Sequence, residues 1–92
     1  MSIDEVDRGV LHLKASIDHL AGQVAAREER LRVEAAAVKE HLRTGRRVRA
    51  KNSLQRQKRL ERSVSGLLSQ QANLETVYEE ILHAETNSKV VR

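Results

Sequence analysis

Residues 41–50 read HLRTGRRVRA and include Thr44-Gly45, the one plausible helix stop in the middle of the chain. On either side of this stop, apolar residues recur every seven positions. The first arm repeats Ile3, Val10, Ile17, Val24, Leu31 and Val38, and the second arm repeats Leu60, Leu67, Leu74 and Ile81. Such a repeat is typical of helices that pack along a seam. Gly45 can adopt the left-handed conformation that commonly ends a helix.

The two repeats share a mirror point at Gly45. If the chain folds back there, residues whose numbers sum to 91 meet, so Leu31 lies opposite Leu60 and Val10 opposite Ile81. We therefore predict an all-α fold, a long antiparallel two-helix hairpin of coiled-coil type. Its helices cover residues 3–43 and 46–86, its bend covers 44–46, and residues 87–92 are frayed. An opened, domain-swapped form would keep the same seam contacts between two chains.

The seam also has a predicted composition. In the second arm it uses Ala50, Ser53, Gln57, Leu60, Val64, Leu67, Gln71, Leu74, Tyr78 and Ile81. In the first arm the regular pattern is interrupted after Val24, because Arg27, Glu34 and His41 occupy the d positions of the heptad. We expect the apolar stripe to drift there toward Ala35 and Leu42, an eleven-residue spacing that straightens the supercoil.

Composition limits what else the chain can be. Its 92 residues are 33% charged and include one Tyr but no Pro, Cys, Trp or Phe, so a large aromatic core is excluded. A thin seam between two helices gives marginal stability, and we expect the hairpin to associate with copies of itself or with other chains. No apolar run reaches the ~18 residues of a membrane span, and the acidic start is unlike a secretory signal. These features predict a cytoplasmic protein without disulfides, neither secreted nor transmembrane.

Charge is strongly segregated along the chain. Residues 43–62 contain nine Lys/Arg and one acid, a net charge of +8, whereas residues 1–20 and 70–92 each have a net charge of −2. In the heptad register Lys51, Lys58, Arg59 and Arg62 point away from the seam, and Arg47, Arg49 and Arg56 flank it. Such a face suits anionic lipid headgroups, nucleic-acid phosphates or the acidic ends of neighbouring subunits. Aromatic residues for base stacking are absent near the bend, which argues against readout of single strands.

The sequence offers no catalytic machinery. The four histidines lack the spacing of metal ligands, and the acidic pairs such as Glu28-Glu29 lie on helix surfaces without a cleft to shift their pKa values. No phosphate-binding glycine loop or nucleophile motif is present. We predict a protein that is not an enzyme and that uses no catalytic residue, metal, cofactor or small-molecule substrate.

The second arm resembles the ESCRT-III family, the charged multivesicular body proteins. The similarity lies in residues 50–61, AKNSLQRQKRLE, in the later Leu67, Leu74 and Ile81, in Ala84 and the closing Val90-Val91, and in the Gly45-Arg46-Arg47 bend. It covers mainly residues 43–91, while residues 3–42 agree in length and periodicity. Among the subtypes, the nuclear-envelope member is the most similar.

The resemblance implies a subunit that polymerises with itself and with related subunits into filaments on endosomal or nuclear-envelope membranes, and that remodels or severs them. It implies that Arg47, Lys51, Lys58 and Arg62 contact anionic lipid. Leu54, Leu68 and Leu82 lie beside the seam and are the predicted assembly face. The family's short N-terminal anchor and regulatory acidic C-terminal half have no counterpart in these residues, so the chain is expected to be a hairpin fragment of the family core.

Two other interpretations use the same residues. A basic-tipped antiparallel coiled-coil arm could bind structured RNA, as helical arms do in some tRNA-handling enzymes, without assembling into a polymer. A plain scaffold coiled coil is the third interpretation, and it leaves the segregated charge without a role.

Overall fold

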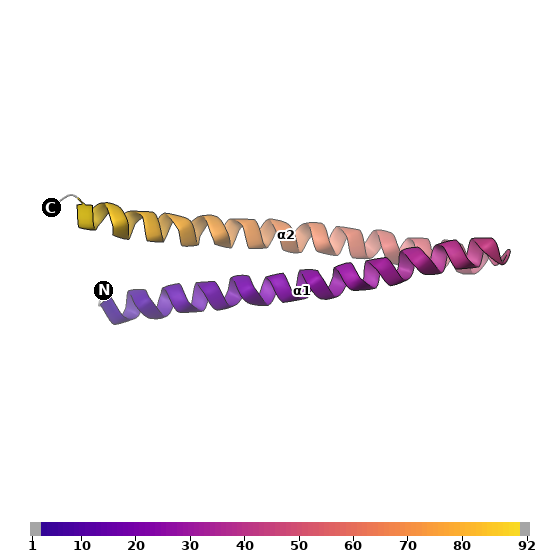
Figure 1. Ribbon diagram of the computed structural model, residues 1–92, viewed down its shortest axis with the longest axis horizontal. Helices are drawn as coiled ribbons and strands as arrows, with labels where there is room; N and C mark the ends of the chain where they lie inside the picture. The colour runs from indigo at the N-terminus through magenta and orange to yellow at the C-terminus, as the bar shows by residue number, and fades with distance from the viewer. Residues whose placement is uncertain (1–2, 91–92) are drawn as a thin grey trace.

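The protein is a helical hairpin. The computed structural model describes the backbone of residues 3–90 and the side chains of residues 5–85. In that range the chain forms two long helices, α1 (Ile3–Arg43) and α2 (Arg47–Val90), which run antiparallel along one another (Figure 1). The molecule measures 71 × 20 × 13 Å and has a radius of gyration of 20.5 Å. A compact domain of this length would have a radius of gyration of about 12 Å. The predicted all-α hairpin is confirmed.

The helix bounds agree with the prediction at three of four ends. α1 covers the predicted residues, and α2 begins at Arg47, one residue later than expected. At the other end α2 continues to Val90 instead of ending near residue 86, so the prediction of a frayed segment from residue 87 is wrong for residues 87–90. Thr86 and Asn87 have low helix propensity, but that cost is small beside the cooperative extension of a long helix. Residues 91–92 lie outside the described residues.

The bend at residues 44–46 is a Schellman motif. The amide of Arg46 donates to the carbonyl of His41 at 2.7 Å, and the amide of Gly45 donates to the carbonyl of Leu42 at 3.2 Å. Gly45 has a φ of +75°, the left-handed conformation that this motif requires and that glycine adopts without steric cost. The Thr44 hydroxyl donates to the carbonyl of Glu40 at 3.0 Å. The carbonyls of Glu40, His41 and Leu42 at the end of α1 are thereby satisfied by residues 44–46.

The start of α2 is capped less well. The carbonyl of Arg46 accepts the first helical hydrogen bond from the amide of Ala50 at 2.9 Å, which makes Arg46 the N-cap. An arginine side chain has no acceptor for the free amides of the first turn. The first turn of α2 also contains no acidic residue. The positive end of the α2 dipole is therefore left without a compensating negative charge from its own first turn.

The seam follows the heptad register along both helices. All ten seam residues predicted for the second arm are buried or half-buried. In α1 every a and d position from Val6 to His41 is buried or half-buried, including Arg27, Glu34 and His41. The expected drift of the stripe is wrong at Leu42, which is 59% exposed, whereas Ala35 is half-buried as expected. The three polar d residues stay in the seam. Glu34 forms an ion pair described below, Arg27 donates to the carbonyl of Gln23 at 3.5 Å, and His41 is part of the tight bend.

Burial is concentrated near the bend. The buried residues among those described are Val24, Ala50, Ser53 and Val64. Ala50 and Ser53 lie beside the bend, Val24 and Val64 lie near the middle of the rod, and only Ser53 has no exposed surface. Toward the termini the two ribbons lie apart in Figure 1, and the aliphatic seam residues there are only half-buried. The molecule is thus closed tightly at the bend and more loosely at the open end.

Candidate anion-binding and assembly faces

The basic segment lies on the exposed surface of the bend and of the first turns of α2. Of its nine Lys/Arg residues, two have an acidic partner: Arg43 pairs with Glu40 at 2.6 Å, and Arg56 pairs with Glu34 at 3.0 Å. The other seven are exposed, and within the described residues no ion pair engages them. They are Arg46, Arg47, Arg49, Lys51, Lys58, Arg59 and Arg62. Seven uncompensated positive charges along one short segment repel one another, and an anionic partner would relieve that repulsion.

Three of these cations surround one hollow on the outer side of α2. Lys58, Arg59 and Arg62 line it together with Gln55, and its volume is about 340 Å³. These residues share a helix face, because positions three, four and seven apart lie above one another. Arginine and lysine donors that converge in this way suit a phosphate or carboxylate group.

A second basic hollow lies at the bend itself. It is lined by Gly45, Arg46, Arg47, Val48 and Arg49 and has a volume of about 500 Å³. Val48 is 73% exposed here, and Leu42 at the end of α1 is 59% exposed. The bend therefore presents apolar side chains among its arginines. Lys51 lines neither hollow, although it is exposed on the same helix.

Arg56 is held by a polar cluster in the seam and does not belong to the free basic face. Its Nε donates to Glu34 Oε1 at 3.0 Å, and its Nη2 donates to the Oγ of the fully buried Ser53 at 3.0 Å. The second carboxylate oxygen of Glu34 is buried without a hydrogen-bond partner, and so is Nδ1 of His41. The cluster bridges α1 and α2 and fixes their register, at the cost of polar atoms left unsatisfied.

The end of α1 has its own local ion pair. The hydrogen bond from Arg43 lowers the pKa of Glu40 below its ordinary value; desolvation opposes this in part, and nearby Arg46 and His41 add smaller lowering effects. The same bond raises the pKa of Arg43. Since Arg43 lies in the last turn of α1, its positive charge also suits the negative end of that helix dipole.

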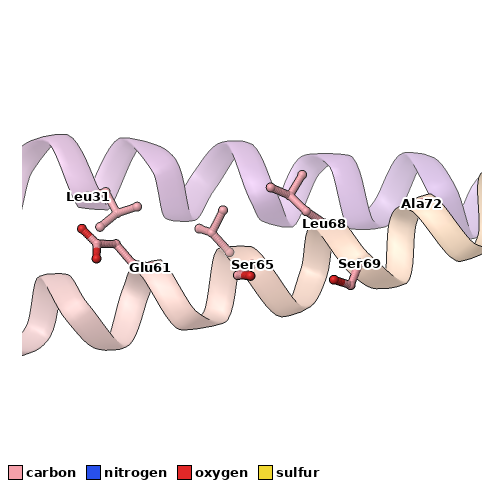
Figure 2. A pocket seen from close by; sticks show the side chains of 7 residues that line it. Leu31, Glu61, Ser65, Leu68, Ser69 and Ala72 are labelled. Atoms are coloured by element: carbon pink, nitrogen blue, oxygen red, sulfur yellow. The ribbon is translucent and has the colours of Figure 1, made fainter.

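The three leucines of the predicted assembly face are partly exposed along α2. Leu54, Leu68 and Leu82 are 40%, 48% and 39% exposed. Beside Leu68 lies a groove of about 450 Å³ between the helices, lined by Leu31, Glu61, Val64, Ser65, Leu68, Ser69 and Ala72. Figure 2 shows Leu31 and Glu61 directed toward each other across the groove, with Ser65, Ser69 and Ala72 along α2. The small side chains at Ser65, Ser69 and Ala72 leave this hollow in the face.

Sequence reasoning located the charged residues of the two hollows except Arg46, and it missed the uncharged residues Gln55 and Val48. Gln55 and Arg46 line the hollows, and Val48 is an exposed apolar residue in the middle of the basic segment. The f position of Val48 in the heptad, on the side away from the seam, was the signal that could have identified it.

The described residues offer neither a candidate membrane span nor a candidate metal site. No helix among them is long and apolar enough to cross a membrane. No three His, Asp or Glu residues in the described part of the chain come together as metal ligands would.

Comparison with known proteins gives no relative for this chain. No family model matches it, and no curated protein and no solved structure is significantly similar to it. The described architecture defines the class of the molecule, an all-α helical hairpin of coiled-coil type.

Proposed function

We propose that this hairpin is a non-catalytic structural subunit that binds anionic membrane surfaces through the bend and the outer face of α2, and that assembles with itself there. Membrane remodelling of the ESCRT-III type, on the cytoplasmic side of endosomal or nuclear-envelope membranes, is the process that this proposal assigns to it. The observation that carries the proposal is the set of seven exposed cations without an acidic partner.

The exposed apolar residues at the bend favour lipid over nucleic acid. Val48 and Leu42 lie next to Arg46, Arg47 and Arg49, so the bend combines positive charge with side chains that can enter the boundary between headgroups and acyl chains. A surface that binds only phosphates gains nothing from an exposed valine. The hollow of Lys58, Arg59 and Arg62 lies further along the same helix and would add contacts to headgroups along the rod.

Vesicle sedimentation tests the electrostatic part. The chain should sediment with vesicles containing phosphatidylserine, remain soluble with pure phosphatidylcholine, and lose binding as salt is raised. Each basic residue near an anionic surface contributes about 1 kcal/mol, so the double variant Arg59→Glu/Arg62→Glu should lower binding by about 2 kcal/mol or more, roughly thirty-fold. Arg8→Glu/Lys14→Glu on α1 makes the same charge change near the termini, far from the basic segment, and should retain more binding. Equal sedimentation with neutral vesicles would overturn the proposal.

The apolar part has its own control. Val48→Ser should reduce vesicle binding, whereas Leu11→Ser should not, because Leu11 is similarly exposed at 68% but lies on α1 far from the basic segment. Binding of structured RNA, measured beside vesicle binding, distinguishes the RNA-binding interpretation from the lipid-binding one. Tight RNA binding that is insensitive to Val48→Ser, together with weak vesicle binding, would favour the RNA arm. Electron microscopy on acidic vesicles tests assembly, and filaments are expected.

A further inference from the structure

The exposed surface of α2 is positively charged near the bend and negatively charged near the other end of the helix. Residues 46–62 include eight Lys/Arg and one acid, whereas residues 70–85 include four acids and no Lys/Arg. Residues 63–74 between them carry no charged side chain. A second α2 laid antiparallel against the first would bring the basic part of each copy onto the acidic part of the other. A parallel, in-register copy would bring like charges together.

The exposed leucines have the same centre of symmetry. Leu54, Leu68 and Leu82 are fourteen residues apart, so reversing the helix about Leu68 exchanges Leu54 with Leu82 and returns Leu68 to itself. The same reversal brings Lys51 to Glu85 and Lys58 to within one residue of Glu79. These lysines and glutamates are exposed, and within the described residues neither lysine has an ion-pair partner. The apolar pattern and the charge pattern thus specify one register independently.

We infer that two copies of this chain pair through this face as an antiparallel, two-fold symmetric dimer centred on Leu68. In the dimer Leu68 packs against Leu68 of the second copy, Leu54 packs against Leu82, and Lys51 and Lys58 face Glu85 and Glu79. The inference rests on the self-assembly part of the proposed function and gives it an orientation and a register. A two-fold contact is self-complementary and closed, so this pair would be the repeating unit of any larger assembly.

The groove beside Leu68 lies where the two-fold axis passes. Its serines and alanine, Ser65, Ser69 and Ala72, are small enough for the leucine of the second copy to enter. The paired segments, from Leu54 to Leu82, are about 42 Å long at ~1.5 Å per residue.

Two symmetry-related like-charge contacts are part of the same register. Glu61 comes to lie near Glu75 of the second copy, and each of these carboxylates already accepts a hydrogen bond on its own helix, from Gln57 at 3.4 Å and from Gln71 at 3.1 Å. Glu61→Gln should therefore tighten the dimer. If the two copies pair through another face, Glu61 and Glu75 stay apart and Glu61→Gln leaves the dimer Kd unchanged.

Distances between spin labels test the orientation. The chain has no cysteine, so Ser69→Cys and Gln55→Cys each place one label on each copy. In the antiparallel dimer the two labels at residue 69 lie close together, while the two at residue 55 are about 40 Å apart along the rod. Parallel in-register packing makes both distances short and would overturn the inference. A chain that stays monomeric in sedimentation at all accessible concentrations would overturn it as well.

Substitutions test the contacts by sedimentation equilibrium. Leu68→Gln should raise the dimer Kd at least tenfold with helical content unchanged, whereas Leu11→Gln on α1 should leave it as it is. Lys58→Glu should weaken the dimer, and adding Glu79→Lys to the same chain should restore it, because the exchanged charges again face each other. A dimer unaffected by Leu68→Gln, or no rescue by the charge exchange, refutes this face.

Membrane binding is scored separately on the same proteins. Leu68→Gln should still sediment with phosphatidylserine vesicles, and Arg47→Glu/Arg49→Glu, which changes the bend outside the paired segment from Leu54 to Leu82, should lose vesicle binding and still form the dimer in solution. For the original chain, an intact dimer without vesicle binding counts against the proposed membrane role alone. Vesicle binding by the original chain without a dimer counts against the inferred pairing alone.

Discussion

The half of the seam next to the bend is the more polar half, and it is also the more deeply buried. The half next to the termini is more apolar and less buried. The bend half (residues 24–43 and 47–67) includes Arg27, Glu34, His41 and Ser53, yet every fully buried residue of the described chain lies in it. The open half (residues 5–23 and 68–85) has a mainly aliphatic seam apart from Gln71 and Tyr78, yet none of its side chains is buried. Hydrophobicity therefore does not decide where this hairpin closes.

Side-chain size and the turn explain the difference. Ala50 and Ser53 are small, so the two helices can approach closely beside a turn that already ties them together. At the open end, Leu13, Ile17 and Tyr78 are large and no connection holds the helices there. The hairpin is therefore closely packed at the bend, where the residues are small, and loosely packed at the open end, where they are large. The following substitutions test this difference.

The largest effect should come from enlarging the small residue of the bend half. Ser53→Leu places a leucine where the serine has no exposed surface, and it should destabilise the hairpin by about 2–3 kcal/mol because the helices must move apart. Gln71→Leu in the half-buried seam of the open half replaces a polar side chain by an apolar one of similar volume and should stabilise the hairpin by about 1 kcal/mol. Urea denaturation followed by circular dichroism measures both. Stabilisation by Ser53→Leu would mean that the bend half is not closely packed.

Breaking the interhelical ion pair should have the next largest effect. Arg56→Met leaves the carboxylate of Glu34, whose side chain is 20% exposed, without its partner and should cost about 1–2 kcal/mol. Adding Glu34→Leu removes the stranded carboxylate and should return the stability at least to that of the original chain. Arg32→Met breaks the exposed pair with Glu29 and should change stability by less than about 0.5 kcal/mol. Equal losses for Arg32→Met and Arg56→Met would remove the distinction between seam and surface.

Alanine in place of glycine should have opposite effects at two positions. Gly45→Ala puts a Cβ on a residue with a φ of +75° and should destabilise the hairpin by about 1 kcal/mol. Gly22→Ala lies within α1, where an added Cβ meets nothing within 4 Å, and should stabilise by about 0.5–1 kcal/mol. Melting temperatures of the two variants give the comparison. The same sign for both would show that the turn does not depend on the left-handed conformation.

The smallest effect concerns the ion pair at the end of α1. Because the pKa of Glu40 is lowered in the folded chain, its contribution to stability is present above the unfolded pKa and is lost as pH falls through the folded pKa. Arg43→Gln should move the pKa of Glu40 back toward its ordinary value, as carboxyl chemical shifts in an NMR titration would record. An unchanged titration curve in Arg43→Gln would assign the lowering to another charge.

The sequence was sufficient to predict the residues of the seam but not the geometry of its polar part. Heptad spacing alone identified all ten seam residues of α2, from Ala50 to Ile81, and the mirror point at Gly45 identified the turn. It failed at Leu42, because a pattern of apolar residues treats Glu34 and His41 as interruptions. The contact between Glu34 and Arg56 spans the two helices, and nothing local in the sequence encodes it.

The same limit applies to the functional surface. The sequence predicted which cations are exposed, since a charged side chain off the seam has no other place to lie. It did not predict that Lys58, Arg59 and Arg62 line one hollow while Arg56 is engaged in the seam, because that division depends on where Glu34 lies on the other helix.

The self-contained turn makes the length of this molecule adjustable in fixed steps. Residues 44–46 satisfy the end of α1 with backbone bonds to His41 and Leu42 and need no support from the rest of the rod. Insertions that preserve the register must therefore add seven residues to each arm, and each such pair lengthens the rod by about 10 Å. A seven-residue insertion in one arm alone would displace Glu34 from Arg56 and mismatch every layer beyond it. The length of the hairpin is therefore set by the number of heptads in its two arms.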